Sequence, residues 1–206
     1  MPQPVSAILL AAGRSQRMGR CKPLLPLGER SVIERCLESL HGSGLEEIVV
    51  VLGHAAEQIT QALAGQPVTV TLVRNPDPDS DMAGSVRCGL GALDPAAQGV
   101  LVCLTDHPLV RPATVSRLLA FHRAHPGFIS IPTCAGKKGH PTLFPRQILE
   151  ELAQAPTLRH LVRRDPQRVR TLEVDDAGVV LDMDTPEDYR RALEIWAQQA
   201  TLPPVP

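Results

Sequence analysis

The sequence predicts an α/β protein with one domain, built as a Rossmann-like three-layer sandwich in which helices cover both faces of a mainly parallel sheet. Segments typical of strands alternate along the chain with segments typical of helices. The early strand segments are apolar along their whole length, as in parallel strands buried on both faces. The 206 residues contain no internal repeat and no linker rich in Pro, Gly or Ser. We therefore expect one domain over residues 1–206, with an ordered core from about 5 to 199 and a frayed tail over 200–206.

Apolar runs, capping residues and chain breakers predict the elements of the amino-terminal half. The apolar run from Val5 to Ala11 predicts a first, buried strand. Ser31 and Glu34 form a capping-box pattern, which predicts a helix that ends near Leu40. The segments that follow are a strand over 47–52, a helix over 55–63, a strand over 68–74, a loop over 75–79, a helix over 85–93 and a strand over 100–105.

The carboxyl-terminal half continues the alternation. Pro112 suits the first turn of a helix, which we expect over 112–125. The two glycines of 136–139 predict a tight turn, and Thr185 is placed to cap a closing helix that ends near Gln199. The remaining expected segments are strands over 128–132, 142–144, 169–174 and 179–181, and a helix over 146–152.

Composition argues against several classes of function. A net charge of -1 and a pI of about 6.6 disfavour binding to nucleic acid or to an anionic membrane surface, and only 2% of the residues are aromatic. No apolar run is long enough to span a bilayer, and residues 1–4 do not resemble a signal peptide. The five cysteines are scattered without C-x-x-C spacing, so neither a disulfide framework nor a structural zinc site is indicated. We expect a protein of the reducing cytoplasm.

The loop after the first strand concentrates positive charge in a chain that is nearly neutral overall. It holds two glycines, three arginines and one lysine, and no acid lies between Gly13 and Lys22. Small residues let backbone N–H groups approach a phosphate, while Arg17 and Lys22 would offset its charge. The loop has neither the P-loop pattern nor the dinucleotide fingerprint. We therefore predict a triphosphate site at the carboxyl end of the first strand; the alternative is an ordinary strand-to-helix turn with surface arginines.

Asp106 follows another apolar strand and is expected at the same edge of the sheet. A carboxylate beside a triphosphate repels it unless a cation lies between them, and Mg²⁺ is the usual hard cation for that role. The alternative is a structural one, because an aspartate before Pro108 also favours a helix cap or an Asx turn. Beside a phosphate-binding loop, the metal interpretation is favoured.

A second acidic candidate lies near the end of the chain. Asp182 and Asp184 alternate along an extended segment, so their side chains face the same side. The dipole of the closing helix accounts for the acids at 187 and 188, but not for Asp184, which precedes the cap. We expect Asp184 to be the second ligand of the metal ion.

Two other stretches matter only if they overhang this site. Residues 136–141 include His140, and the simpler interpretation is a hairpin turn with solvated lysines. Residues 75–87 include Ser85, which could merely begin a helix after a polar loop. Cys21 lies in the phosphate loop, yet no histidine or acid is arranged in sequence to make it a nucleophile.

Taken together, these motifs resemble the molybdenum-cofactor (molybdopterin) cytidylyltransferase family, within the molybdopterin nucleotidyltransferase-like superfamily. The resemblance runs from Val5 to about Trp196. Its specific parts are LAAGRSQRMG at 10–19, KPLLP at 22–26, DHPLV at 106–110, GHP at 139–141 and DTPEDY at 184–189. The fold it implies is the nucleotide-diphospho-sugar-transferase type of α/β sandwich.

The resemblance implies transfer of CMP from CTP to the terminal phosphate of molybdopterin, which releases pyrophosphate and forms molybdopterin cytosine dinucleotide. That product would serve molybdenum hydroxylases, so a hydroxylase or its chaperone is an expected partner. Ala12 stands where the guanosine-using branch tends to have glycine, and a larger residue there would narrow the base pocket toward a pyrimidine.

The resemblance also implies roles for individual residues. Mg²⁺, with Mn²⁺ as an alternative, would be held by Asp106 and Asp184, and Lys22, Arg17 and Asp106 would be catalytic. His107 and His140 would contact the acceptor. The nucleotide would be bound by Leu10, Ala11, Ala12, Gly13, Arg14, Ser15, Arg17, Met18, Gly19, Lys22 and Ser85.

Two further functions stay open at this point. One is the same metal-dependent chemistry with GTP, or with a sugar phosphate or another small phosphate as acceptor. The other belongs to a different class: a non-catalytic partner that binds nucleotide and cofactor for a molybdenum hydroxylase. Release of pyrophosphate would separate an enzyme from such a binding partner.

Overall fold

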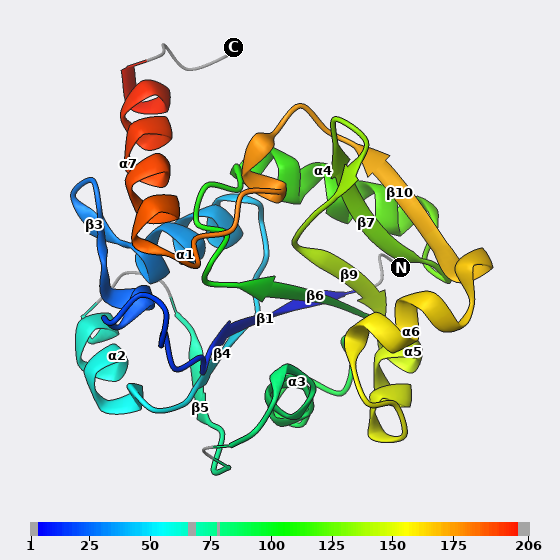
Figure 1. Cartoon of the computed structure of the whole chain (residues 1–206). Coiled ribbons are helices and arrows are strands. Elements are labelled where there is room, and N and C mark those ends of the chain that lie inside the picture. The colour runs from blue at the N-terminus through cyan, green and yellow to red at the C-terminus, as the bar shows by residue number, and fades with distance from the viewer. Residues whose placement is uncertain (1–3, 66–68, 78, 202–206) are drawn as a thin grey trace.

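A computed structural model describes residues 4–65, 69–77 and 79–201 and shows one central sheet with helices on both faces (Figure 1). The strands of the sheet are β1 Val5–Ala11, β4 Ile48–Leu52, β5 Thr71–Arg74, β6 Gly99–Leu104, β7 Ile129–Cys134, β8 Lys137–Lys138, β9 Thr142–Pro145 and β10 Val169–Glu173. Their order is β10-β7-β9-β6-β1-β4-β5, with β8 paired to β7. Within this sheet β9 and β8 run antiparallel to their neighbours and the other pairings are parallel. The predicted mainly parallel sheet is confirmed.

The helices divide into two layers. On one face lie α1 Val32–Gly42, α2 Ala56–Leu63 and α4 Pro112–Ala124, and on the other lie α3 Met82–Leu90, α5 Arg146–Glu150 and α6 Leu158–Arg164. Successive side chains of β1 point alternately to the two faces of the sheet. Ala7, Leu9 and Ala11 join the first hydrophobic cluster, whereas Ile8 and Leu10 join the second. The three-layer sandwich predicted from the sequence is therefore confirmed.

The last helix, α7 Pro186–Thr201, packs on a small hairpin near the start of the chain. That hairpin pairs β2 Pro26–Leu27 with β3 Arg30–Ser31. The hydroxyl of Tyr189 donates a hydrogen bond of 2.6 Å to the carbonyl of Pro26, and the guanidinium of Arg35 lies 4.0 Å from the ring centroid of Trp196. Figure 1 shows α7 standing beside β3 and α1. Chain segments far apart in sequence thus meet beside the glycine-rich loop.

Two predicted elements differ from the observed ones because an aspartate side chain caps the backbone. Helix α3 begins at Met82 and not at Ser85, since Asp81 accepts a hydrogen bond of 2.8 Å from the N–H of Gly84. The predicted strand over 179–181 is wrong: a 3₁₀ turn, η4 Ala177–Val179, forms there. Asp176 caps that turn by accepting a hydrogen bond of 3.0 Å from the N–H of Gly178.

Other differences concern turns and short helices. The predicted turn over 136–139 lies one residue earlier, at Ala135 and Gly136, whose φ angles of 50° and 76° suit a two-residue hairpin turn. The predicted helix over 146–152 divides into α5 and a 3₁₀ turn, η2 Glu151–Ala153, and α6 was not predicted. Val68 and residues 202–206 of the predicted strand and tail lie outside the described residues, and α7 reaches Thr201. No helix in the described ranges is long and apolar enough to cross a membrane.

Candidate active site

A pocket lies at the carboxyl ends of β1 and β6, where the strand order reverses direction. From β1 the chain proceeds to β4 and β5 on one side, and then returns to β6 on the other. Ligands of open α/β sheets bind outside such a switch point. The pocket holds about 200 Å³ of space. Its walls are Leu10, Ala12, Gly13, Ser15, Lys22, Pro23, Ser80, Asp81, Met82, Ser85, Leu104, Thr105 and Asp106.

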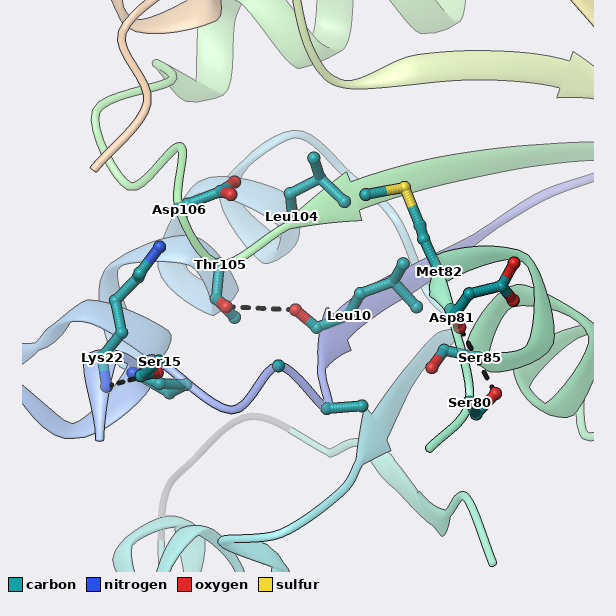
Figure 2. A pocket seen from close by; sticks show the side chains of 13 residues that line it. Leu10, Ser15, Lys22, Ser80, Asp81, Met82, Ser85, Leu104, Thr105 and Asp106 are labelled. Atoms are coloured by element: carbon teal, nitrogen blue, oxygen red, sulfur yellow. Dashed lines mark hydrogen bonds between the residues drawn. The ribbon is translucent and has the colours of Figure 1, made fainter. Parts of the chain in front are cut away.

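Ser15 organises the glycine-rich loop at one end of this pocket. Its backbone carbonyl accepts hydrogen bonds of 3.1 Å from the N–H groups of Met18 and Gly19, and its Oγ accepts one of 3.1 Å from the N–H of Lys22. Both Ser15 and Gly19 have positive φ angles, 50° and 67°, so the loop folds back on itself. Lys22 begins the 3₁₀ turn η1 Lys22–Leu24 and points toward the pocket (Figure 2).

Two cations of this loop hold Asp184, which arrives from the other end of the chain. Lys22 Nζ lies 2.7 Å from Asp184 Oδ1, and Arg17 Nη2 lies 2.6 Å from Asp184 Oδ2. The side chain of Lys22 is 11% exposed, whereas that of Arg17 is 72% exposed. The hydrogen bond from Lys22, together with the charge of Arg17, lowers the pKa of Asp184 below its usual value. Asp184 is therefore ionised and neutralised by the same cations predicted to bind phosphate.

Asp106 faces the same centre from the end of β6. Its Oδ1 is buried and accepts no hydrogen bond from the described residues. Burial raises the pKa of Asp106, and the negative charges of Asp184 and Asp182 raise it further, against the opposing charges of His107 and Lys22. An unpartnered buried carboxylate oxygen is costly unless a cation or a proton joins it.

The two carboxylates fit a divalent cation that also binds a substrate. No group of three or more His, Cys, Asp or Glu side chains in the described parts of the chain is arranged to hold a metal ion by itself. Mg²⁺ is ordinarily held by one or two carboxylates, with waters and substrate phosphates as its other ligands. The pair Asp106 and Asp184 meets that requirement beside the cationic loop.

The opposite end of the pocket is formed by the start of α3 (Figure 2). Ser85 is buried, and its Oγ accepts a hydrogen bond of 3.1 Å from Asn75 Nδ2. Met82 is 49% exposed and faces Leu10 and Leu104 across the pocket. An elongated ligand in this pocket would thus meet charged side chains at one end, and apolar side chains with the hydroxyl group of Ser85 at the other.

Several predicted site residues lie outside this pocket. Ala11 and Met18 are buried in hydrophobic clusters, Gly19 forms a turn, and Arg14 pairs with Asp79. Ser80, Asp81 and Met82 belong to the stretch 75–87, which was expected to matter only if it overhung the site, and they do line the pocket; the lining residues Pro23, Leu104 and Thr105 were not predicted as site residues. An aspartate just before an apolar helical segment is a capping signal, and it would have placed the start of α3 at the pocket.

The two histidines predicted to contact an acceptor lie behind Asp106. The rings of His107 and His140 have centroids 4.9 Å apart, and both line a small, mostly apolar cavity with Cys36, Cys103 and neighbouring residues. His107 Nε2 is 3.7 Å from Asp106 Oδ1, and burial lowers the pKa of His140 to about 4. Acceptor contact by these rings stays a prediction.

Comparison with known proteins identifies the family of this chain. The MobA-like NTP transferase domain matches residues 7–174. The chain belongs to this family. It is therefore a nucleotidyltransferase of the MobA-like type, and the pocket at the switch point is the candidate site for its nucleoside triphosphate. The matched region ends before Asp184 and α7, so the second acid lies beyond it.

Relatives of this MobA-like protein carry different names. The molybdenum cofactor cytidylyltransferase of Escherichia coli (strain K12) is 24% identical over 94% of this chain and 98% of its own length. Nicotine blue oxidoreductase of Paenarthrobacter nicotinovorans is 31% identical over 92% of this chain and 96% of that protein. The chain spans 27% of the bifunctional protein GlmU of Kineococcus radiotolerans, at 37% identity over 134 residues.

Solved structures share the whole fold. A nucleotidyl transferase from Methanothermobacter thermautotroptrophicus has a TM-score of 0.83 at 26% identity and covers 95% of this chain and 99% of its own. Rv0371c from Mycobacterium tuberculosis, in complex with manganese, has a TM-score of 0.75 at 31% identity and covers 93% and 98%. A structural relative of the MobA-like protein, Rv0371c, has thus been solved with the divalent cation manganese.

Proposed function

We propose that this protein transfers CMP from CTP to the terminal phosphate of molybdopterin, releasing pyrophosphate and forming molybdopterin cytosine dinucleotide. One observation carries the catalytic part of the proposal: Lys22 and Arg17 pair with Asp184, while Asp106 at the end of β6 has a buried Oδ1 that accepts no hydrogen bond from the described residues. The motifs that resemble cytidylyltransferases and the relative of that name support the choice of substrates.

The residues of the cationic end would bind the triphosphate tail. Its oxygens would compete with Asp184 for Lys22 and Arg17. Backbone N–H groups of the loop at Gly13 and Arg14 would add donors. Asp184, released from these cations, and Asp106 would hold Mg²⁺, or Mn²⁺ as an alternative. Bound there, the ion would neutralise phosphate charge and polarise the reacting phosphoryl group.

The reaction needs position and charge neutralisation more than it needs acid–base chemistry. An oxygen of the acceptor phosphate forms a bond to the α-phosphorus of CTP, and the bond from that phosphorus to the bridging oxygen of pyrophosphate breaks. The nucleophilic phosphate is already ionised at neutral pH, so no general base is required. Lys22 and Arg17 would stabilise the negative charge that develops on the departing pyrophosphate.

The opposite end of the pocket would take the cytosine. Ala12 lines this pocket, and a side chain on Gly53 would overlap the carbonyl of Ala12, so the end of β4 packs closely behind it. A methyl group at position 12 narrows the space in comparison with glycine. Ser85 offers a hydroxyl group, and Met82 with Leu104 offers apolar surface for a flat ring. These features favour a pyrimidine.

Nucleotide consumption is the decisive test. Purified protein with Mg²⁺ and molybdopterin should release pyrophosphate with CTP faster than with GTP, UTP or ATP. Asp106→Ala and Asp184→Ala should abolish turnover, whereas Asp182→Ala, which removes a neighbouring exposed acid, should retain most of it. Normal turnover in the Asp106 variant would remove the metal assignment.

The same experiment also tests other acceptor phosphates, other nucleotides and a function without catalysis. Release of pyrophosphate only with sugar phosphates, or only with GTP, would replace the proposed substrates but keep the reaction. Binding of CTP without any release would favour a non-catalytic partner of a molybdenum hydroxylase. Because one relative is named an oxidoreductase, oxidation of NADPH in the presence of candidate acceptors should be measured in parallel. Our proposal predicts none.

A further inference from the structure

Asp176 is a buried acid that the proposed reaction does not use. Its side chain is only 1% exposed. The residue lies in the segment that joins β10 to Asp184. Oδ2 accepts hydrogen bonds of 3.0 Å from the N–H of Arg111 and 2.6 Å from Oγ1 of Thr114. Oδ1 accepts one of 3.0 Å from the N–H of Gly178 and lies 3.5 Å from Nε of Arg111. A buried carboxylate with this many donors is held in one position.

These hydrogen bonds fasten the start of α4 to another part of the chain. Arg111 is the cap residue of that helix and makes no side-chain capping bond of its own. Asp176 accepts hydrogen bonds from the N–H of Arg111 and from the hydroxyl of Thr114 in the first turn, and its negative charge lies at the positive end of the helix dipole. The loop that leads from Asp106 into α4 is therefore tied to the segment that leads to Asp184.

Backbone packing reinforces the tie. A side chain on Gly178 would overlap the carbonyl of Leu109 and would lie 2.8 Å from the backbone nitrogen of Val110. The carbonyl of Gly178 lies 3.4 Å from Nδ1 of His107, the residue after Asp106. Turn η4 thus lies directly against the loop that follows Asp106, with no room for a side chain between them.

The other side of η4 is held as firmly. The carbonyl of Val179 accepts a hydrogen bond of 2.8 Å from the N–H of His140, and a side chain on Gly139 would overlap the same carbonyl. Five residues farther along the chain comes Asp184, after Met183, which is 1% exposed in the hydrophobic cluster that also contains Leu109. The path from Asp176 to Asp184 is therefore short and packed.

We propose that Asp176 is a positioning residue that sets the separation of Asp106 and Asp184, so that both carboxylates can reach one divalent cation. The inference rests on the proposed function, because it concerns the metal of that site. Asp176 touches neither metal nor substrate; it acts by joining the backbone segments from which the two ligands project. Its loss would leave both acids present but separated incorrectly.

The test compares the affinity for CTP with and without Mn²⁺, by calorimetry in the absence of an acceptor. Asp176→Asn replaces an acceptor oxygen by an N–H₂ group that faces N–H or O–H donors. It should weaken binding of the Mn²⁺–CTP complex by about tenfold or more, the usual effect of losing a group that orients a metal ligand. Binding of CTP without metal should change little, because Lys22 and Arg17 are retained.

Milder variants separate positioning from general destabilisation. Thr114→Val removes one hydrogen bond to Asp176 and should weaken Mn²⁺–CTP binding, whereas Thr114→Ser keeps the hydroxyl and should restore it. Thr157→Val is the matched control, since it removes a helix-capping hydrogen bond at α6, away from η4 and α4. It should lower the melting temperature without affecting the metal.

The outcomes distinguish this inference from the proposed function. If Thr114→Val and Asp176→Asn lower the melting temperature as Thr157→Val does but leave the Mn²⁺ effect intact, Asp176 is only structural and the inference is wrong. If the wild-type protein binds CTP equally with and without Mn²⁺, the shared metal site itself fails, and the proposed function fails with it.

Discussion

The ammonium group of Lys22 is the most constrained cation of the site. It is largely buried and pairs with an acid 162 residues away in sequence. Without such a cation, the negative charges of Asp106 and Asp184 would repel each other. Burial raises the pKa of Asp106, and the charge of Asp184 raises it further. Lys22 therefore stabilises the unliganded site and, in the proposed reaction, would exchange its carboxylate partner for a phosphate.

Replacing Lys22 by alanine should lower kcat by about 10²–10³, the usual loss when a preorganised group that stabilises developing charge is removed. Steady-state release of pyrophosphate measures it. Arg190→Ala is a matched control, because Arg190 pairs with Glu187 on the exposed side of α7. A Lys22 variant that loses no more activity than the Arg190 variant would contradict the role of Lys22.

His140 makes stability depend on pH. In the folded protein, burial lowers the pKa of His140 from 6.5 to about 4. Between these two pH values the side chain is protonated in the unfolded chain but neutral in the folded one. Stability is therefore lost as the pH falls from about 6.5 toward 4, and at pH 5 the cost from this residue is about 2 kcal/mol. Urea unfolding at pH 7.5 and pH 5 measures it. His140→Gln should lose less stability than the wild type over that range; equal losses would contradict the assignment.

Individual site residues could be predicted where a simple rule governs them. Asp106, Lys22 and Gly13 follow strands whose carboxyl ends meet at one edge, and all three line the pocket. The side chain of Ala11, also expected to contact the nucleotide, lies in the core with Leu9, as the period of two along β1 requires. The pairing of Asp184 with Lys22 depends on long-range packing of α7, which no local pattern specifies.

At the scale of elements, the position of α3 on the sheet is set by a glycine. A Cβ on Gly89 would lie 2.8 Å from a methyl of Ile8 and 2.9 Å from a methyl of Val51. The helix therefore packs closely on β1 and β4, and its first turn brings Met82 and Ser85 to the pocket.

Gly89→Ala should push α3 away from the sheet, costing about 1–3 kcal/mol of unfolding free energy as an overpacked core does. It should also raise the KM for CTP, because Ser85 and Met82 move with the helix. Gly91→Ala is the control, since its nearest neighbour would be 3.6 Å away. Denaturant unfolding and initial rates measure both effects; a Gly89 variant with an unchanged KM would show that α3 does not shape the pocket.

Elements with strong local signals were predicted well. The apolar run gives both ends of β1, and the capping box gives the start of α1, with the backbone nitrogen of Ser31 2.7 Å from Glu34 Oε2; α1 ends at Gly42, two residues beyond the predicted end. The errors lie where a polar side chain caps a turn within an apolar segment, as Asp176 does at η4, or where a helix is short, as in α6. Residues 177–180 are apolar enough for a strand, but the hydrogen bond from Gly178 to Asp176 favours a turn instead.

At the scale of the whole molecule, α7 closes the chain on itself. It packs through Trp196 and Tyr189 on the hairpin of β2 and β3, and its first residue, Pro186, lies two positions after Asp184. The hairpin in turn follows the loop that carries Lys22. The proposed single domain therefore requires that α7 unfold together with the sheet.

Trp196 is the only tryptophan, so its fluorescence reports on α7 alone. In urea, the fluorescence transition and the loss of helix and sheet by circular dichroism should coincide, as expected for one cooperative unit. Tyr189→Phe, which removes the hydrogen bond to Pro26, should shift both transitions together by about 1 kcal/mol. A fluorescence change that precedes the dichroism change would instead show that α7 unfolds as a separate unit.

The contact between Lys22 and Asp184 spans 162 residues, and this has a consequence for synthesis on the ribosome. A nascent chain displays its cationic loop early, but the acid that completes the site is translated only after the whole sheet. If Asp184 holds the metal ion, as proposed, nucleotide transfer would start only after the sheet has been translated, and stabilisation by bound metal and triphosphate would follow only after Asp184 has emerged from the exit tunnel.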